Sequence, residues 1–211
     1  QQIFGVSPER FLSIRQGKMI SEPIKGSRPR GATPEDDLIL AQELQANPKD
    51  KAENLMIVDL LRNDLGACCK PGSISASPLF ELRQFSNVQH LVSTVNGELS
   101  DGISPLEALW QAFPGGSITG APKKRAMEII HELEPFARGA YCGSFFWMDD
   151  QGNMDSNILI RSLHWMQDSS GAQVVLRAGA GIVVDSDAQR ELAETRAKAR
   201  GLLLALGAKH V

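Results

Sequence analysis

Strand-like segments enclose helical ones in this chain, and this order excludes many folds. The predicted strands cover residues 3–14, 18–24, parts of 74–95, 141–148, 157–165 and 173–184. The last three are in hairpin order, because short Gly-containing turns separate them. Helices do not alternate with single strands as they do in a parallel βαβ sheet. We therefore expect an α+β fold with largely antiparallel sheets flanked by helices.

Capping residues mark where the helices begin. Asn47-Pro48 is an N-cap followed by proline at the first helical position, and Ser104 and Glu107 form a capping box. Helices are expected over residues 36–45, 48–63, 105–113, 122–134 and, from Ser186 or Asp187, to about 206. The Gly-rich turn after Pro114 is a candidate binding loop.

Composition is that of an ordinary globular domain. The 211 residues are 42% hydrophobic and 22% charged, so residues 1–211 are expected to form one domain with a sizeable core. A net charge of -3 with no basic run argues against nucleic acid as a partner. The sequence shows neither a membrane span nor a signal peptide, so the expected compartment is the cytoplasm. The chain begins without methionine in strand-like sequence, which is typical of a piece of a longer protein.

The three cysteines, Cys68, Cys69 and Cys142, have no metal-ligand spacing of the C-x-x-C kind. Adjacent cysteines also have poor geometry for a disulfide. We interpret all three as reduced packing residues.

Acidic side chains on two helices are candidate metal ligands. Glu191, Glu194 and Lys198 share one face of the last helix, where the alternative is a solvated stripe with a Glu194–Lys198 ion pair. Glu53 begins a helix whose segment 55–58 is so apolar that we expect the helix to be mostly buried. Glu53 with Glu194 would suit Mg²⁺, whereas the alternative for Glu53 is a first-turn glutamate that complements the helix dipole.

Residues 115–123 look like a phosphate-binding loop but miss one essential position. The Walker A pattern needs lysine directly after its second spaced glycine, and Ala121 stands there. ATP is therefore rejected, although backbone amides and the Thr119 hydroxyl at a helix N-terminus still favour an anion.

Four further features have both a structural and a functional interpretation. Arg161, in a predicted strand, is either a water-facing edge residue or a half-buried guanidinium that grips a carboxylate. His90 is a satisfied core histidine or a site residue, and the glycines of 178–181 permit close approach of a substrate. Lys25 ends an apolar strand, either as a solvated lysine or as a nucleophile whose pKa would have to be lowered.

Taken together, several motifs closely resemble the chorismate-utilising enzymes. They include Pro23-Ile24-Lys25-Gly26, and in order along the chain the matching segments are residues 7–11, 23–26, 52–60, 89–91, 113–123 and 178–183. The resemblance covers nearly the whole chain. It implies a fold of large sheets flanked by helices, like that of anthranilate synthase, with Mg²⁺ as cofactor.

The resemblance also implies roles for individual residues. Glu53 and Glu194, with Glu191 close by, would hold Mg²⁺, which in turn would bind the ring carboxylate of chorismate. Glu9 would protonate the departing C4 hydroxyl. The remaining substrate contacts would be Gly179, Gly181 and Lys198 at the ring carboxylate, Tyr141 and Arg161 at the enolpyruvyl carboxylate, and Thr119 and His90 beside the ring.

Lys25 suggests a branch of this family. Anthranilate-forming members usually have a small residue at this position, whereas members that make 4-amino-4-deoxychorismate for 4-aminobenzoate and folate synthesis resemble this chain in having lysine. The resemblance implies that Lys25 forms a covalent intermediate at ring C2 and that a glutamine amidotransferase subunit supplies ammonia. The alternatives are an anthranilate- or isochorismate-forming enzyme and, from another class, a non-catalytic module that docks an amidotransferase. The family's N-terminal half is missing from this sequence, so we expect the piece alone to be a poor catalyst.

Overall fold

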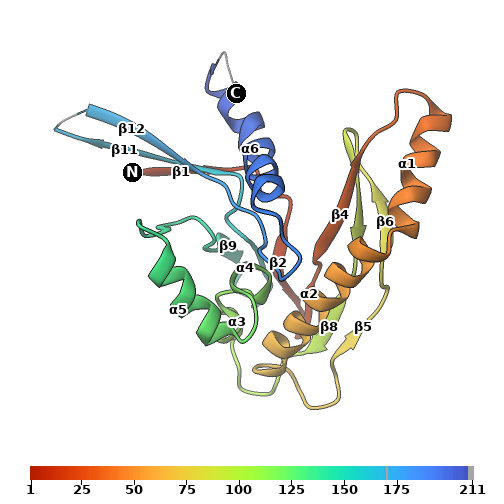
Figure 1. Ribbon diagram of the computed structural model, residues 1–211. Helices are drawn as coiled ribbons and strands as arrows, with labels where there is room; N and C mark the ends of the chain where they lie inside the picture. The colour runs from red at the N-terminus through yellow and green to blue at the C-terminus, as the bar shows by residue number, and fades with distance from the viewer. Residues whose placement is uncertain (170, 209–211) are drawn as a thin grey trace. The chain divides into compact units, whose positions relative to one another are not determined.

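The computed structural model describes residues 1–169 and 171–208 (Figure 1). Their contacts group the chain into two compact units. Unit 1 contains residues 1–8, 134–145 and 157–211, and unit 2 contains residues 9–133 and 146–156. Within the described part of the chain, no helix has both the length and the apolar character needed to cross a membrane.

Three helices begin at their predicted capping residues, Asn47, Ser104 and Asp187, whereas the first begins at Pro34, two residues before its expected start. Asn47 accepts hydrogen bonds from the N–H groups of Lys49 and Asp50, and Ser104 accepts one from Glu107. The helices are α1 (Pro34–Ala46), α2 (Pro48–Gly66), α3 (Pro105–Ala112), α4 (Gly116–Thr119), α5 (Lys123–Leu133) and α6 (Ala188–Ala205). The short helix α4 was not predicted, because four residues in a Gly-rich turn give no periodic pattern.

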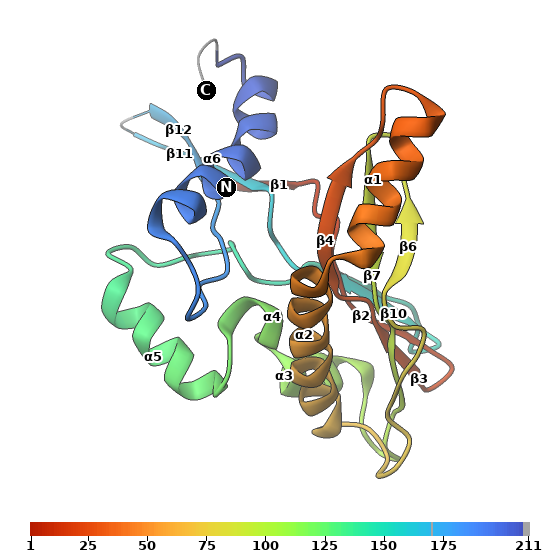
Figure 2. The same ribbon diagram turned by 45° about the vertical axis from the view of Figure 1, so that its right-hand side comes forward.

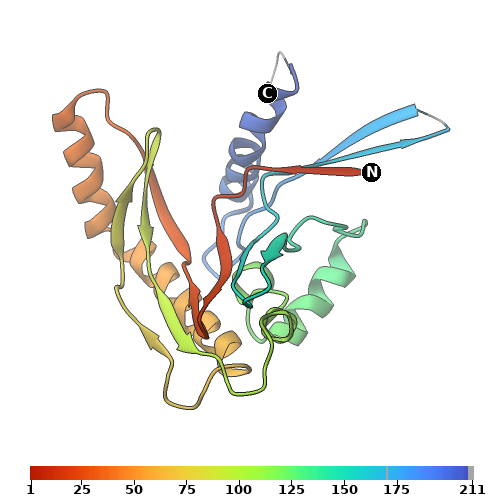
Figure 3. The same cartoon turned by 180° about the vertical axis from the view of Figure 1, so that it is seen from behind.

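Two sheets build unit 2. One has the strand order β5-β8-β3-β2-β10-β9 and the other the order β4-β7-β6. Their bounds are β2 (Arg10–Arg15), β3 (Lys18–Ser21), β4 (Ile24–Pro29), β5 (Ser75–Ala76), β6 (Glu81–Gln84), β7 (Val88–Val92), β8 (Val95–Glu98), β9 (Phe146–Met148) and β10 (Met154–Asn157). Helices α1 and α2 pack on β4 and β7, as Figure 2 shows. Figure 3 shows the same strands from behind.

Unit 1 is built on a smaller sheet. Strand β1 (Gln2–Gly5) pairs antiparallel with β11 (Ser162–Asp168), which forms a hairpin with β12 (Gly171–Arg177). Helix α6 contacts β12. Together with the antiparallel ladders of unit 2, this sheet confirms the predicted α+β architecture.

Several predicted strands are wrong in their extent. The strand over residues 3–14 is broken at residues 6–9, where Pro8 cannot donate a backbone hydrogen bond. Residues 139–142 form a turn, residues 143–145 are irregular, and Cys142 has a positive φ of 66°. The segment 157–165 is interrupted at 158–161, and the strand over 173–184 ends at Arg177. The turns at Cys142 and Arg161 were missed because both segments are apolar and because residues other than glycine rarely adopt the positive φ found at these two positions.

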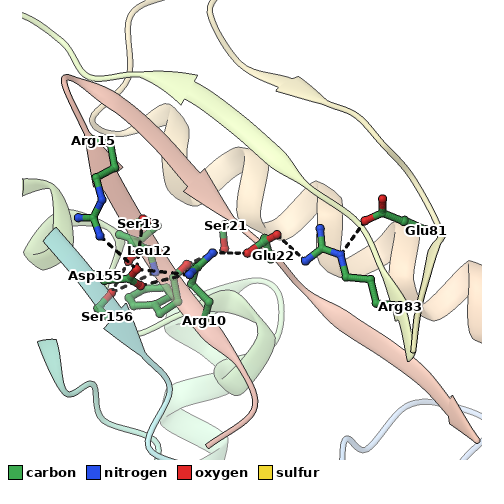
Figure 4. A network of polar contacts seen from close by, with 11 residues as sticks. Arg10, Leu12, Ser13, Arg15, Ser21, Glu22, Glu81, Arg83, Asp155 and Ser156 are labelled. Carbon is green, nitrogen blue, oxygen red and sulfur yellow. Dashed lines mark hydrogen bonds and ion pairs between the residues drawn. The ribbon is translucent and has the colours of Figure 1, made fainter. Parts of the chain in front are cut away.

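A polar network crosses the strands of unit 2 (Figure 4). Asp155 on β10 accepts from Arg10 Nε at 3.1 Å, and Arg10 also pairs with Glu22. Glu22 binds Arg83 of β6 at 2.6 Å. Burial opposes ionisation of Glu22, but the hydrogen bonds and positive charges of Arg83 and Arg10 outweigh it and lower its pKa. The network therefore ties the six-stranded sheet to the strand β6 through charged hydrogen bonds.

Candidate active site

Lys25 does not end a strand, as was expected, because β3 ends at Ser21 and β4 begins at Ile24. Lys25 instead lies at a bulge near the start of β4. The register of β4 against β7 shifts between Ile24 and Ser27, so Lys25 and Gly26 have no paired residue on β7. A bulge turns a side chain away from the regular strand direction. Gly26 has a φ of +83°, and a Cβ there would lie 3.0 Å from Asp50 Cβ and Leu44 Cδ1. The glycine at position 26 therefore permits the bulge, and the bulge fixes the position of the half-buried Lys25.

His90 lies on β7 opposite Ser27, two residues from Lys25. The residue is 6% exposed, and its Nδ1 lies 2.6 Å from Ser27 Oγ. The Phe85 ring packs at 5.7 Å from it. The structure thus supports the interpretation of His90 as a satisfied core histidine, and it fixes that ring near the bulge.

The Gly-rich turn connects Glu9 and Thr119 through Ser117. Ser117 Oγ donates a hydrogen bond to Glu9 Oε1 at 3.1 Å, and Ser117 and Thr119 share helix α4. The Thr119 hydroxyl lies within 3.3 Å of the Gly115 carbonyl oxygen. Unit 2 therefore contains both proposed catalytic groups, Lys25 and Glu9, and this turn.

Asp64 was missed by the sequence analysis, although it holds the turn. Its side chain is 3% exposed, forms an ion pair with Lys123 Nζ at 2.7 Å, and accepts from the Gly116 N–H at 2.8 Å. Lys123 also donates to the Ala112 carbonyl. The sequence signal was an acidic residue among the buried positions of α2, seven residues after Ile57.

The expectation that α2 is mostly buried is wrong. Leu55 and Met56 are 44% and 45% exposed, whereas Ile57 and Val58 are buried. Successive residues in a helix point about 100° apart, so four consecutive apolar residues cannot all face one core. The Glu53 side chain is one third exposed, and its Oε1 lies 3.7 Å from Lys49 Nζ.

In unit 1 the predicted carboxylate-binding residues form a connected group. Lys198 Nζ donates to the Gly179 carbonyl at 3.2 Å and pairs with Glu194 Oε1 at 2.6 Å. A Cβ on Gly179 would lie 3.0 Å from the Tyr141 hydroxyl oxygen. A side chain at position 179 would therefore press on Tyr141, which explains the glycine at that place.

Tyr141 lines a cavity within unit 1. The cavity measures about 220 Å³, and Arg138, His164 and Arg177 are among its lining residues. Burial raises the pKa of Tyr141, and the neighbouring Cys142 thiol adds to the rise.

Three other predicted residues of unit 1 have different surroundings. Arg161 is not in a strand: it has a φ of +49° just before β11, and its side chain is exposed. A Cβ added to Gly181 would have no other atom within 4 Å. Glu191 Oε1 accepts from the Ser186 hydroxyl at 2.9 Å, near the start of α6.

The predicted Mg²⁺ ligands are divided between the units. Glu53 belongs to unit 2, and Glu191 and Glu194 belong to unit 1. Over residues 1–169 and 171–208, no three His, Cys, Asp or Glu side chains gather as a metal site. The donors are all carboxylate oxygens, which is the chemistry that Mg²⁺ prefers.

Comparison with known proteins identifies the family. Residues 1–204 match the family described as chorismate binding enzyme. The chain is 50% identical over 201 residues to aminodeoxychorismate synthase component 1 of Klebsiella aerogenes and 45% identical over 205 residues to anthranilate synthase component 1 of Bacillus caldotenax. Those alignments cover 95% and 97% of this chain.

A solved structure agrees with these sequence matches. Anthranilate synthase component I of Streptococcus pneumoniae TIGR4 superposes with a TM-score of 0.81 at 39% identity, over 95% of this chain and 43% of that one. The chain spans 44% and 40% of the two curated relatives. With a family match over nearly its entire length and the same fold, this chain belongs to the chorismate-binding enzyme family.

Proposed function

We propose that the protein converts chorismate and ammonia to 4-amino-4-deoxychorismate, on the route to 4-aminobenzoate and folate, in the cytoplasm. The bulge that presents Lys25 carries this proposal, because it gives a lysine amine a defined position beside Gly26 and near His90. The 50% identity to an aminodeoxychorismate synthase component 1 supports it.

The proposed chemistry uses two side chains of unit 2. The Lys25 amine, as its free base, attacks ring C2 of chorismate as the C4 hydroxyl leaves. Glu9 gives its proton to that hydroxyl, which departs as water, because hydroxide is a poor leaving group. Ammonia then adds at C4 and expels the lysine from C2, and the pyruvyl group is kept. The hydrogen bond from Ser117 orients Glu9 for this role.

Residues of unit 1 would hold the substrate carboxylates. Lys198 and the backbone at Gly179 would bind the ring carboxylate, while Tyr141 would donate to the enolpyruvyl carboxylate. In the same proposal, Gly181 and Arg161 assist at these two carboxylates, and Thr119 and His90 border the ring. Glu53, Glu191 and Glu194 would hold Mg²⁺, which when bound neutralises charge on the ring carboxylate.

The proposed partner is a glutamine amidotransferase that supplies ammonia. The relative from Klebsiella aerogenes is named component 1, which implies a second component. The product of this protein would then need a separate lyase to yield 4-aminobenzoate.

A product assay with the whole protein tests the proposal. Incubation with chorismate, Mg²⁺ and ammonium should yield 4-amino-4-deoxychorismate, and Lys25→Ala should lower the rate by at least about 100-fold, equivalent to roughly 2.7 kcal/mol in the barrier. Lys18→Ala, at an exposed position of β3, is the matched control and should keep the rate. Near-normal turnover by Lys25→Ala would contradict the covalent mechanism.

The second candidate is anthranilate formation. It is favoured by the 45% identity to an anthranilate synthase component 1 and by the superposition on another. The same incubation separates the two, because anthranilate formation releases pyruvate whereas the aminodeoxychorismate product retains it.

A further inference from the structure

Three sulfur atoms meet in the core of unit 2. Cys68 Sγ and Cys69 Sγ each lie 3.9 Å from Met19 Sδ. Met19 and Cys68 are 0% exposed, and Cys69 is 5% exposed. We call Met19, Cys68 and Cys69 the sulfur cluster. None of its members has a role in the proposed reaction.

The backbone after α2 directs both cysteines to one place. In an extended strand, neighbouring side chains point to opposite faces. Here Cys68 and Cys69 follow the last turn of the helix, and both of their N–H groups donate to the Leu65 carbonyl, at 3.1 and 2.9 Å. This turn allows two consecutive thiols to approach the same methionine.

Gly97 provides the space for this arrangement. It is the direct partner of Met19 in the β3–β8 ladder, so a side chain there would project to the same face as Met19. A Cβ at Gly97 would lie only 2.6 Å from Cys69 Sγ. The sulfur therefore occupies the volume that any other residue at position 97 would fill.

The two separations from the Met19 sulfur match those in a three-coordinate metal site. With metal–sulfur bonds of about 2.3 Å, three ligands around a trigonal ion are about 4.0 Å apart. The separations from Met19 Sδ to Cys68 Sγ and to Cys69 Sγ, both 3.9 Å, agree with that value. Two thiols and a thioether are soft ligands, and soft ligands select Cu(I). Zinc prefers four ligands and thiolate, imidazole or carboxylate donors, so it fits this set poorly.

We propose that Met19, Cys68 and Cys69 form a binding site for one soft, thiophilic cation of the Cu(I) class. Each thiol that becomes a thiolate ligand releases its proton to solvent.

Anaerobic titration of the reduced 211-residue protein with Cu(I), in competition with a chromophoric Cu(I) chelator, tests the site. One equivalent should bind, with a thiolate-to-copper absorption band in the ultraviolet. Cys69→Ser should weaken binding by about 100-fold or more, because even the loss of an outer-sphere partner costs up to about 100-fold. Cys142→Ser removes a thiol of unit 1 and is the matched control, expected to leave the affinity unchanged.

A second variant keeps the test independent of stability. A serine hydroxyl in the core lowers the free energy of unfolding, whereas Met19→Leu conserves volume and its fold can be checked by circular dichroism. Met19→Leu should weaken Cu(I) binding by about 10-fold, within the range for altered metal surroundings. Unchanged affinity in Cys69→Ser would overturn the site, and unchanged affinity in Met19→Leu would overturn its three-sulfur geometry. Tighter binding of Zn(II) than of Cu(I) would overturn the choice of ion.

Discussion

Asp64 on α2 and Lys123 at the start of α5 form an ion pair whose carboxylate is almost completely buried, with 2.7 Å between Oδ1 and Nζ. The same carboxylate accepts from the Gly116 N–H at the start of α4. One side chain thus fixes the Gly-rich turn, which through Ser117 also orients Glu9. We expect the turn to be sensitive to changes at Asp64.

Asp64→Asn should lower the free energy of unfolding by about 2 kcal/mol, because Lys123 loses its counter-charge in a partly desolvated place. Asp59→Asn is the matched control on the same helix, since the Asp59 pair with Arg62 is exposed and should be worth under about 1 kcal/mol. Urea unfolding of the three proteins gives both differences. Equal losses in the two variants would contradict the assigned role of Asp64.

Gly26→Ala should be more destabilising than Gly72→Ala. Both glycines have positive φ, +83° and +78°, so each substitution should cost about 1–2 kcal/mol in backbone strain. At Gly26 the new methyl group would also meet Asp50 Cβ and Leu44 Cδ1 at 3.0 Å, whereas nothing lies within 4 Å at Gly72. Chemical denaturation measures the difference, and equal losses would argue against a close contact at the bulge.

Asp37 should make stability depend on acid pH. The hydrogen bonds from Arg30 and from the Gly31 N–H lower its pKa from 3.8 to about 2. A lowered folded-state pKa adds stability above the unfolded-state value, and this stability is lost as pH falls from about 4 to about 2. The urea midpoint of Asp37→Asn should therefore approach that of the native protein in this range. A constant gap between the two proteins from pH 5 to pH 2 would contradict the assignment.

Lys198→Met should weaken chorismate binding without unfolding the protein. Loss of a charge-assisted hydrogen bond costs about 1.5–3 kcal/mol, so binding should weaken by about 10- to 100-fold. Because the Lys198–Glu194 pair is exposed, the free energy of unfolding should change by less than about 1 kcal/mol. Arg196→Met, on another face of α6, is the control. Calorimetry with the whole protein measures binding, and equal affinity for both variants would remove Lys198 from the site.

Removal of Mg²⁺ should abolish tight chorismate binding to the whole protein, because carboxylates of the protein and of the substrate repel one another without a cation. Glu194→Gln should weaken Mg²⁺ binding, whereas Glu132→Gln, on α5, should not. Calorimetric titrations with and without a chelator provide the comparison. Equally tight chorismate binding in excess chelator would contradict the predicted cofactor.

Helix starts were predictable from sequence because their signals are local. Asn47-Pro48, Ser104 and Asp187 cap the helices in which they were expected, since a side-chain oxygen next to free N–H groups needs no distant partner. Strand ends were not predictable in the same way. The turns at Cys142 and Arg161 depend on hydrogen bonds to Leu159 and Val6, which no short sequence window contains.

In the candidate site, too, local features were predictable from sequence and features that depend on distant residues were not. Gly179 was expected to allow close approach of a substrate, and a Cβ there would lie 3.0 Å from the Tyr141 hydroxyl oxygen. The crowding at Gly26, where a Cβ would lie 3.0 Å from Asp50 and Leu44, was not predicted. Asp64 was missed because its partners, Gly116 and Lys123, are more than fifty residues away, so the helix alone gives no sign of them. The burial of Glu53 was overestimated, because an apolar run in a helix says little about which side faces the core.

The division of the chain into units has a consequence for dissecting the protein. The backbone passes between the units four times, at residues 8–9, 133–134, 145–146 and 156–157. Strand β10, supplied late in the chain, lies next to β2 in the central sheet, and β1, supplied first, pairs with β11. A single proteolytic cut therefore cannot release either unit intact. Truncating the gene from one end cannot produce an intact unit either, because each unit is built from separate segments of the chain. A ribosome must synthesise residue 156 before unit 2 has all its strands.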